Sequence, residues 1–81
     1  MEKRIGVVAI IVEDKKVIDD VNKLLSNFAE SIVGRMGVPY KEKQVSIISL
    51  IVDGTTDEIG ALTGKLGRLE GVTVKSALTK K

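Results

Sequence analysis

Neighbouring carboxylates are the part of this sequence that comes closest to a catalytic pattern. Three acidic pairs occur, namely Glu13 with Asp14, Asp19 with Asp20, and Asp57 with Glu58. A pair of carboxylates can share general acid and base roles only if both face one site, whereas adjacent residues of a helix point in different directions. The first and last pairs also fall where helices are expected to begin, and negative charge there complements the helix dipole. None of the pairs therefore predicts a catalytic residue.

The sequence contains neither histidine nor cysteine among its 81 residues. A serine or cysteine nucleophile activated by imidazole is therefore excluded. The thiolate and imidazole ligands of structural zinc and of iron–sulfur clusters are missing as well. We predict that the chain is not an enzyme and that it holds no metal and no cofactor.

Charge and aromatic content argue against a nucleic-acid or membrane surface. The 13 basic and 11 acidic residues are mixed along the chain and leave a net charge of only +2, which does not indicate a dedicated basic surface. RNA-binding domains of similar topology stack bases on strand aromatics. Here Phe28 and Tyr40 are the only aromatic residues, and neither belongs to an expected central strand. We do not expect direct nucleic-acid binding or membrane association.

Arg35 and Tyr40 are candidates for binding a small ligand. They belong to an irregular segment that also contains Gly34 and Gly37. An arginine beside glycines can bind a carboxylate or a phosphate, and an ordinary edge-strand charge is the alternative. The turn between the first strand and the first helix adds Glu13 and Asp14 to the candidate ligand-binding residues.

A stripe of glycines marks the second expected helix. Gly60, Gly64 and Gly67 recur on one side of it, away from its apolar face. Each glycine inside a helix costs about 1 kcal/mol relative to alanine. Such a stripe indicates close approach by another backbone or by a ligand, and simple tolerance of glycine is the alternative. We take Gly60 and Gly64 as further candidate ligand-binding residues.

Strands are predicted from β-branched and alternating stretches. The stretches 5–12, 44–52 and 72–78 are expected to form regular strands. Residues 34–43 are expected to form a short, irregular edge strand and a turn, because Pro39 lacks an amide donor.

Two helices are predicted from apolar residues at three- and four-residue intervals. The first begins after Asp14, which can cap it, and is expected to stop at Gly34 and Gly37. The second opens with a capping box of Thr55 and Glu58 and ends before Gly71, where a left-handed residue is favoured. The apolar faces consist of Val17, Val21, Leu24, Leu25, Phe28 and Ile32 in the first helix, and of Ile59, Leu62, Leu66 and Leu69 in the second.

The order strand, helix, weak strand, strand, helix, strand predicts an α+β fold. Two helices of this length cover one face of a four-stranded sheet. The expected architecture is a ferredoxin-like βαββαβ two-layer sandwich with an antiparallel sheet. We expect residues 1–81 to form a single domain, since a chain of this length has no room for a second core.

Both central strands are apolar on both sides, although the helices can cover only one side. In the first strand Ile5, Val7, Ala9 and Ile11 oppose Val8, Ile10 and Val12, and in the third Val45, Ile47 and Ile51 oppose Ile48, Leu50 and Val52. An antiparallel sheet with one wet face should instead alternate. We predict that a second copy covers the free face, in a homodimer or homotetramer. The expected interface residues are Val8, Ile10, Val12, Ile48, Leu50 and Val52, and high β-propensity alone is the alternative explanation.

The apolar run 5–12 follows Lys3 and Arg4 and so superficially resembles a signal peptide. The run is short, is followed by charged residues and lacks a small-residue cleavage site. It is also far below the roughly 20 residues that span a bilayer. We expect a buried strand there and a cytoplasmic protein.

The sequence resembles the iron-only ([FeFe]) hydrogenase system regulator family. The resemblance is carried by the first-helix segment 21–25, by the strand 45–52, by Ile59-Gly60-Ala61-Leu62-Thr63-Gly64-Lys65-Leu66-Gly67 and by Gly71-Val72-Thr73-Val74-Lys75. This family is ACT-like and similar in architecture to the C-terminal domain of the nickel-responsive repressor. The resemblance implies a βαββαβ domain that oligomerises through its sheets and has a regulatory role linked to the hydrogenase system.

Two departures limit what the resemblance implies. Nickel regulators bind their metal with histidine and cysteine, which this chain lacks. Amino-acid-binding ACT domains carry a glycine-containing loop after the first strand, where this chain has Glu13-Asp14-Lys15-Lys16. The expected function is a non-enzymatic, ligand-sensing oligomeric module that responds to a small-molecule effector or a partner protein. The alternative is a structural oligomerisation or docking adaptor without a small-molecule ligand.

Overall fold

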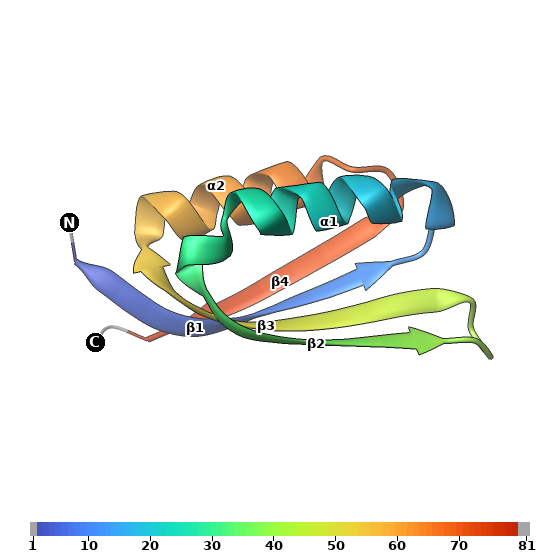
Figure 1. Ribbon diagram of the computed structural model, residues 1–81, viewed down its shortest axis with the longest axis horizontal. Coiled ribbons are helices and arrows are strands. Elements are labelled where there is room, and N and C mark those ends of the chain that lie inside the picture. The colour runs from blue at the N-terminus through green and yellow to red at the C-terminus, as the bar shows by residue number, and fades with distance from the viewer. Residues whose placement is uncertain (1, 80–81) are drawn as a thin grey trace.

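The computed structural model describes residues 2–79 and shows a four-stranded sheet with two α-helices packed on one side (Figure 1). The strands are β1 (Lys3–Val12), β2 (Ile32–Tyr40), β3 (Val45–Thr55) and β4 (Val72–Leu78), and the helices are α1 (Ile18–Asn27) and α2 (Thr56–Gly67). Short 3₁₀ turns flank α1, at Lys15–Val17 (η1) and Ala29–Ser31 (η2). The strand order is β2-β3-β1-β4, and all neighbouring strands are antiparallel. The predicted ferredoxin-like fold is confirmed.

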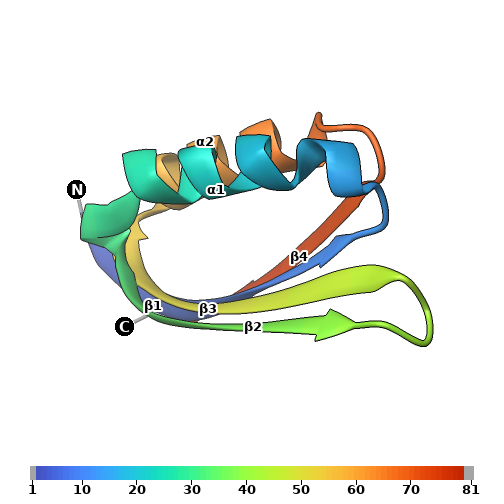
Figure 2. The same ribbon diagram turned by 45° about the vertical axis from the view of Figure 1, so that its right-hand side comes forward.

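The core lies between the helices and the sheet. Figures 1 and 2 show both helices over the same face, and within residues 2–79 no element covers the opposite face. The buried apolar residues are Val8, Ile10 and Val12 of β1, Ile48, Leu50 and Val52 of β3, Val21 and Leu25 of α1, and Ile59, Leu62 and Leu66 of α2. The buried hydrophobic residues of the described chain all belong to this one cluster. Each buried side chain of this kind contributes about 1.5–3 kcal/mol.

The two central strands are paired over ten residues, from Lys3 opposite Thr55 to Val12 opposite Ser46. Side chains alternate between the two faces of a sheet. Opposed residues therefore share a face, and Val8 and Leu50 lie on the helix side.

The predicted oligomer interface is wrong in its choice of sheet face. Val8, Ile10, Val12, Ile48, Leu50 and Val52 are all buried beneath the helices of the same chain. The other face of β3 carries Ser49 and Asp53 among its apolar residues. Since burying polar groups without partners is costly, the helices cover the face on which the central part of β3 is entirely apolar.

The boundary between α1 and β2 also differs from the prediction. The helix ends at Asn27, and Gly34 and Gly37 lie within β2 rather than at the helix end. The Phe28 amide donates to Leu24 and Leu25, and the following 3₁₀ turn buries Ser31. The chain therefore changes direction before it reaches Gly34 and Gly37, and β2 begins earlier and is longer than expected.

The start of α2 agrees with the prediction in detail. The Glu58 amide donates to the Thr55 hydroxyl at 3.1 Å, and the Thr55 amide donates to the Glu58 carboxylate at 2.8 Å. This is a complete capping box. Beyond the helix, Gly71 has a φ of +75°, as expected for a left-handed residue, and β4 starts at Val72.

Candidate functional site

The sheet face away from the helices carries a band of exposed apolar side chains, which we call the open sheet face. Ten large hydrophobic residues are exposed among residues 2–79, and eight of them lie on this face. They are Ile5, Val7 and Ile11 of β1, Met36, Val38 and Tyr40 of β2, and Ile47 and Ile51 of β3. Between 39% and 65% of each side chain is exposed. Monomeric proteins rarely expose large contiguous apolar patches, so this face is a candidate interaction site.

Strand register explains why these side chains meet. Val7 lies opposite Ile51, Ile11 lies opposite Ile47, and Ile47 lies opposite Val38 on its other side. Directly opposed side chains of antiparallel strands have Cβ atoms about 4.5–5.5 Å apart. The three strands β1, β2 and β3 therefore present one contiguous apolar band.

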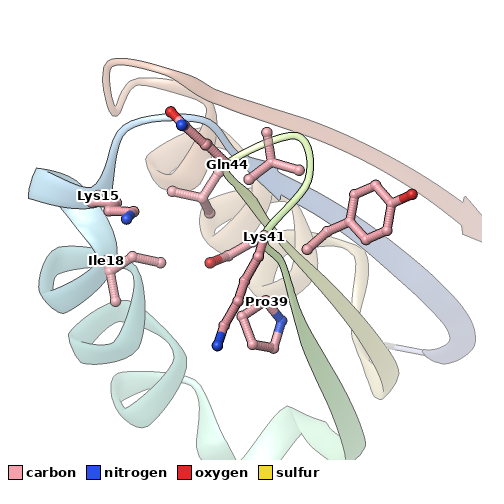
Figure 3. A pocket seen from close by; sticks show the side chains of 9 residues that line it. Lys15, Ile18, Pro39, Lys41 and Gln44 are labelled. Carbon is pink, nitrogen blue, oxygen red and sulfur yellow. The ribbon is translucent and has the colours of Figure 1, made fainter.

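A second feature is a cavity of about 400 Å³ between the start of α1 and the β2–β3 hairpin, which we call the hairpin cleft. Its apolar lining consists of Val12, Ile18, Pro39 and Val45, and its polar lining of Lys15, Tyr40, Lys41, Gln44 and Ser46. Figure 3 shows Lys15 and Ile18 on the helix side of the cleft, and Pro39, Lys41 and Gln44 on the hairpin side. The antiparallel pairing of β1 with β3 brings the two sides together, because Val12 lies opposite Ser46.

The hairpin cleft is positively charged. Neither Lys15 nor Lys41 forms an ion pair or a side-chain hydrogen bond within the described part of the chain, and no carboxylate lines the cavity. A smaller hollow of about 150 Å³ continues the cleft along α1 and β2, sharing Ile18 and Pro39 with it and reaching Arg35. The Arg35 Nη2 atom donates to Asn22 Oδ1 of α1 at 3.3 Å.

The structure brings only part of the sequence-predicted ligand site together. Arg35 and Tyr40 lie beside these two adjoining hollows. Asp14 instead caps η1 by accepting from the Lys16 amide at 2.9 Å, and the Glu13 amide donates to the Gly71 carbonyl at 2.7 Å. Neither acid lines the cleft. Both lie in the turn between β1 and η1, which contacts Gly71 just before β4.

Gly60 and Gly64 lie in a different place. With Thr63 and Gly67 they border an open groove between α2 and the edge strand β4. A Cβ atom added at Gly60, Gly64 or Gly67 would meet no other atom within 4 Å. These glycines are therefore not required by close packing inside one chain.

Sequence reasoning missed Lys15, Lys41 and Gln44. A signal for them exists in the topology, because the end of β1 and the β2–β3 hairpin must lie at the same end of an antiparallel sheet. Lysines follow β1 at positions 15 and 16 and flank the hairpin turn at positions 41 and 43. Placing these two turns side by side would have predicted a basic cluster.

Other chemistry is sparse within residues 2–79. Glu58 belongs to the capping box of α2. Its pKa is lowered by the Thr55 amide, by the Thr55 hydroxyl and by the charge of Lys3. No group of three or more acidic side chains within this range could hold a metal ion. Neither of its helices is long and apolar enough to cross a bilayer.

Residues 4–76 match the model of the TM1266-like family, described as "Iron-only hydrogenase system regulator, putative". The structure of TM1266 from Thermotoga maritima is 44% identical, with a TM-score of 0.93, and the match covers 98% of this chain and 100% of that one. No curated protein sequence matches the chain.

More distant structures share the fold alone. The C-terminal domain of MgtC from Mycobacterium tuberculosis is 14% identical, with a TM-score of 0.69 over 95% of this chain and 88% of that one. CPII from Thiomonas intermedia K12, a nitrogen regulatory PII-like protein, is 15% identical in its apo form, with a TM-score of 0.56 over 94% and 91% of the two chains. A second CPII structure contains ADP, AMP and bicarbonate.

Proposed function

The chain belongs to the TM1266-like family of iron-only hydrogenase system regulators, and from this premise we propose that it is a non-enzymatic regulatory module that works as an assembly of identical copies. The observation that carries the proposal is the open sheet face. Eight partly exposed apolar side chains gather there on three adjacent strands, opposite the face that the helices cover. In a two-fold dimer the same patch of both copies would be buried.

The size of the open sheet face supports a second copy as its cover. The molecule extends 39 × 19 × 17 Å, and the sheet lies along the long axis (Figure 1). A face of this molecule can measure at most about 39 Å by 17 Å on the sheet side, roughly 660 Å² in projection, which is of the same order as the about 800 Å² per partner of a standard protein interface. Covering the exposed half of each apolar side chain would contribute about 1 kcal/mol.

Polar residues are placed as an interface of this kind requires. Asp53 lies opposite Ile5 towards one end of the sheet, and Lys75 belongs to the edge strand β4 opposite Ala9. Both lie on the open side, Asp53 at one end of the apolar band and Lys75 beside it, whereas Ser49 is a small polar residue within the band, opposite Ala9 and Met36. An apolar centre with a polar rim is the usual anatomy of an interface between proteins.

The regulatory part of the proposal includes response to a small molecule in the cytoplasm. The hairpin cleft supports it, because its volume falls within the range of about 300–1,000 Å³ that is usual for ligand sites. The fold also supports it, since a PII-like regulator of the same architecture contains ADP, AMP and bicarbonate in one structure. The absence of histidine and cysteine from the sequence supports a role without catalysis.

The test is the subunit number of variants that place a charge on the open sheet face. In Ile51→Glu a carboxylate replaces an exposed side chain at the centre of the band, where it would be buried in a dimer but solvated in a monomer. We expect the wild type to be a dimer or tetramer in sedimentation equilibrium and native mass spectrometry. Ile51→Glu should be a folded monomer with an unchanged circular dichroism spectrum.

Two control variants make the test specific. Val33→Glu introduces the same charge at an apolar residue that is 70% exposed in the β2 bulge, and it should assemble like the wild type. Leu50→Glu places the charge one residue away from Ile51 but in the core, and it should unfold. A monomeric wild type, or an Ile51→Glu variant that assembles normally, would refute the proposed use of this face.

A further inference from the structure

We infer that the hairpin cleft binds a small organic anion, in which a carboxylate or phosphate group is attached to a compact apolar body. The inference rests on the proposed ligand-responsive role and specifies the ligand. It does not depend on assembly, because every residue of the cleft comes from one chain.

The lining of the cleft has the composition that such a ligand needs. Lys15 approaches from the helix side and Lys41 from the hairpin side (Figure 3). Ammonium groups form short, charge-assisted hydrogen bonds with carboxylate and phosphate oxygens. Ile18 and Pro39 provide apolar walls between the two cations. A purely inorganic anion would leave these walls exposed, whereas an apolar body attached to the anion would cover them.

Nearby acids do not neutralise the two lysines. Asp14 directs its carboxylate to the Lys16 amide at 2.9 Å, and its Cβ lies against Gly71, where an added Cβ would come within 2.9 Å. Glu42 accepts a hydrogen bond from the Tyr40 hydroxyl at 3.4 Å. Neither acid lines the cavity, so the cleft keeps its positive charge and attracts an anion.

Gln44 closes the hairpin turn beside the cleft in an uncommon backbone conformation. It is the only residue other than glycine with a positive φ among residues 2–79, at 55°. The left-handed conformation costs a non-glycine residue roughly 1–2 kcal/mol, and glycine or asparagine would fit this turn position better. Strained residues of this kind cluster at ligand sites. The Gln44 side chain places an amide at the hairpin side of the cleft (Figure 3), where it can donate to an anion or accept from a hydroxyl.

The dimensions limit the size of the ligand. A volume of about 400 Å³ is near the lower end of the usual range for ligand pockets, so one anionic group and a body the size of a ring or a short alkyl chain would fill it. The adjoining hollow at Arg35 would accommodate a second, smaller polar group.

The experiment is a titration of the isotope-labelled full chain followed by amide NMR shifts. Phenyl phosphate and benzoate are the two probes, and they distinguish a preference for phosphate from one for carboxylate because both carry the anion on the same phenyl ring. Inorganic phosphate and phenol are the matched controls, each carrying half of the proposed chemistry. We expect saturable shifts centred on Lys15, Gln44 and Ser46 with at least one probe, and weaker binding of both controls.

Charge variants identify the groups responsible. Lys15→Gln combined with Lys41→Gln should weaken binding of the better probe about tenfold, as expected when two exposed charge-assisted contacts are lost. Lys23→Gln removes the same charge from α1 outside both hollows and should leave affinity unchanged. Spectra of the free variants establish that each one is folded.

Several outcomes would overturn the inference. They are the absence of saturable shifts with both probes, equal affinity for inorganic phosphate and phenyl phosphate, and equal losses in the Lys23→Gln and double variants. Failure here is separable from failure of the proposed assembly. An oligomer that binds neither probe would be a structural adaptor, whereas a monomer that binds phenyl phosphate at these residues would support the cleft and refute the open-face interface.

Discussion

Gly54 packs closely against Ser31, and this contact is possible because glycine has no side chain. Gly54 lies near the end of β3, and a Cβ atom at this position would come within 2.9 Å of the Ser31 Oγ and 3.3 Å of the Glu58 Oε1. Ser31 is itself buried in the turn between α1 and β2. The glycine therefore lets this turn pack against the start of α2, where the capping box begins. At this end of the molecule, single residues fix how the helical layer joins the sheet.

Glu58 should make stability depend on pH. Its pKa in the folded chain is lowered below the ordinary value of 4.5, chiefly because the carboxylate accepts a hydrogen bond from the Thr55 amide. The ionised form is therefore favoured by folding, so its contribution is complete above pH 4.5 and is lost as the pH falls through the lower, folded pKa. Thermal unfolding by circular dichroism between pH 7 and pH 3 should show a smaller loss of stability for Glu58→Gln than for the wild type.

Asp57→Asn is the control for this effect. It removes a carboxylate from the same helical turn without touching the reciprocal hydrogen bonds between Thr55 and Glu58. Its unfolding temperature should follow the pH dependence of the wild type more closely than Glu58→Gln does. If Glu58→Gln and the wild type lost stability in parallel, the capping carboxylate would not be a source of the acid sensitivity.

At the scale of elements, α2 carries glycines that packing within the chain does not require. Gly64→Ala should raise the free energy of unfolding by about 0.5–1 kcal/mol, since glycine is that much worse than alanine inside a helix and an added Cβ meets nothing within 4 Å. Urea unfolding measures the change. Gly54→Ala, with its short contact to Ser31, should be destabilising in the same assay. A loss of stability in Gly64→Ala would indicate that another chain or a ligand packs on this stripe.

Most elements could be predicted from the sequence because their signals are local. The β4 range 72–78 and the capping box at Thr55 follow from alternation and from side-chain hydrogen bonding within one turn. The α1–β2 boundary could not be placed, because it depends on contacts between segments distant in sequence. The apolar periodicity of α1 continues to Phe28 and Ile32, yet burial of Ser31 beside Gly54 turns the chain earlier.

At the scale of the whole molecule, the sequence predicted that two sheet faces are apolar but not which one the helices cover. A register shift of one residue exchanges the faces of a strand, and periodicity alone treats the two faces of β1 as equivalent. The deciding residues are Ser49 and Asp53, which lie on the open side of β3. The hairpin cleft was missed for a related reason, because Lys15 and Lys41 come together only when β1 and β3 pair.

If the open sheet face is an interface, stability must depend on protein concentration. Raising the concentration a hundredfold, from about 5 μM to about 500 μM, adds about 2.7 kcal/mol per dimer by mass action, or about 1.4 kcal/mol per chain. For a domain of this size each kcal/mol moves the unfolding temperature by about 4–8 °C, so the wild type should melt about 6–11 °C higher at the upper concentration. Differential scanning calorimetry covers this range. Val33→Glu should keep the dependence, and Ile51→Glu should melt at one temperature throughout. An unfolding temperature of the wild type that does not change with concentration would show that the eight apolar side chains of this face remain exposed in solution.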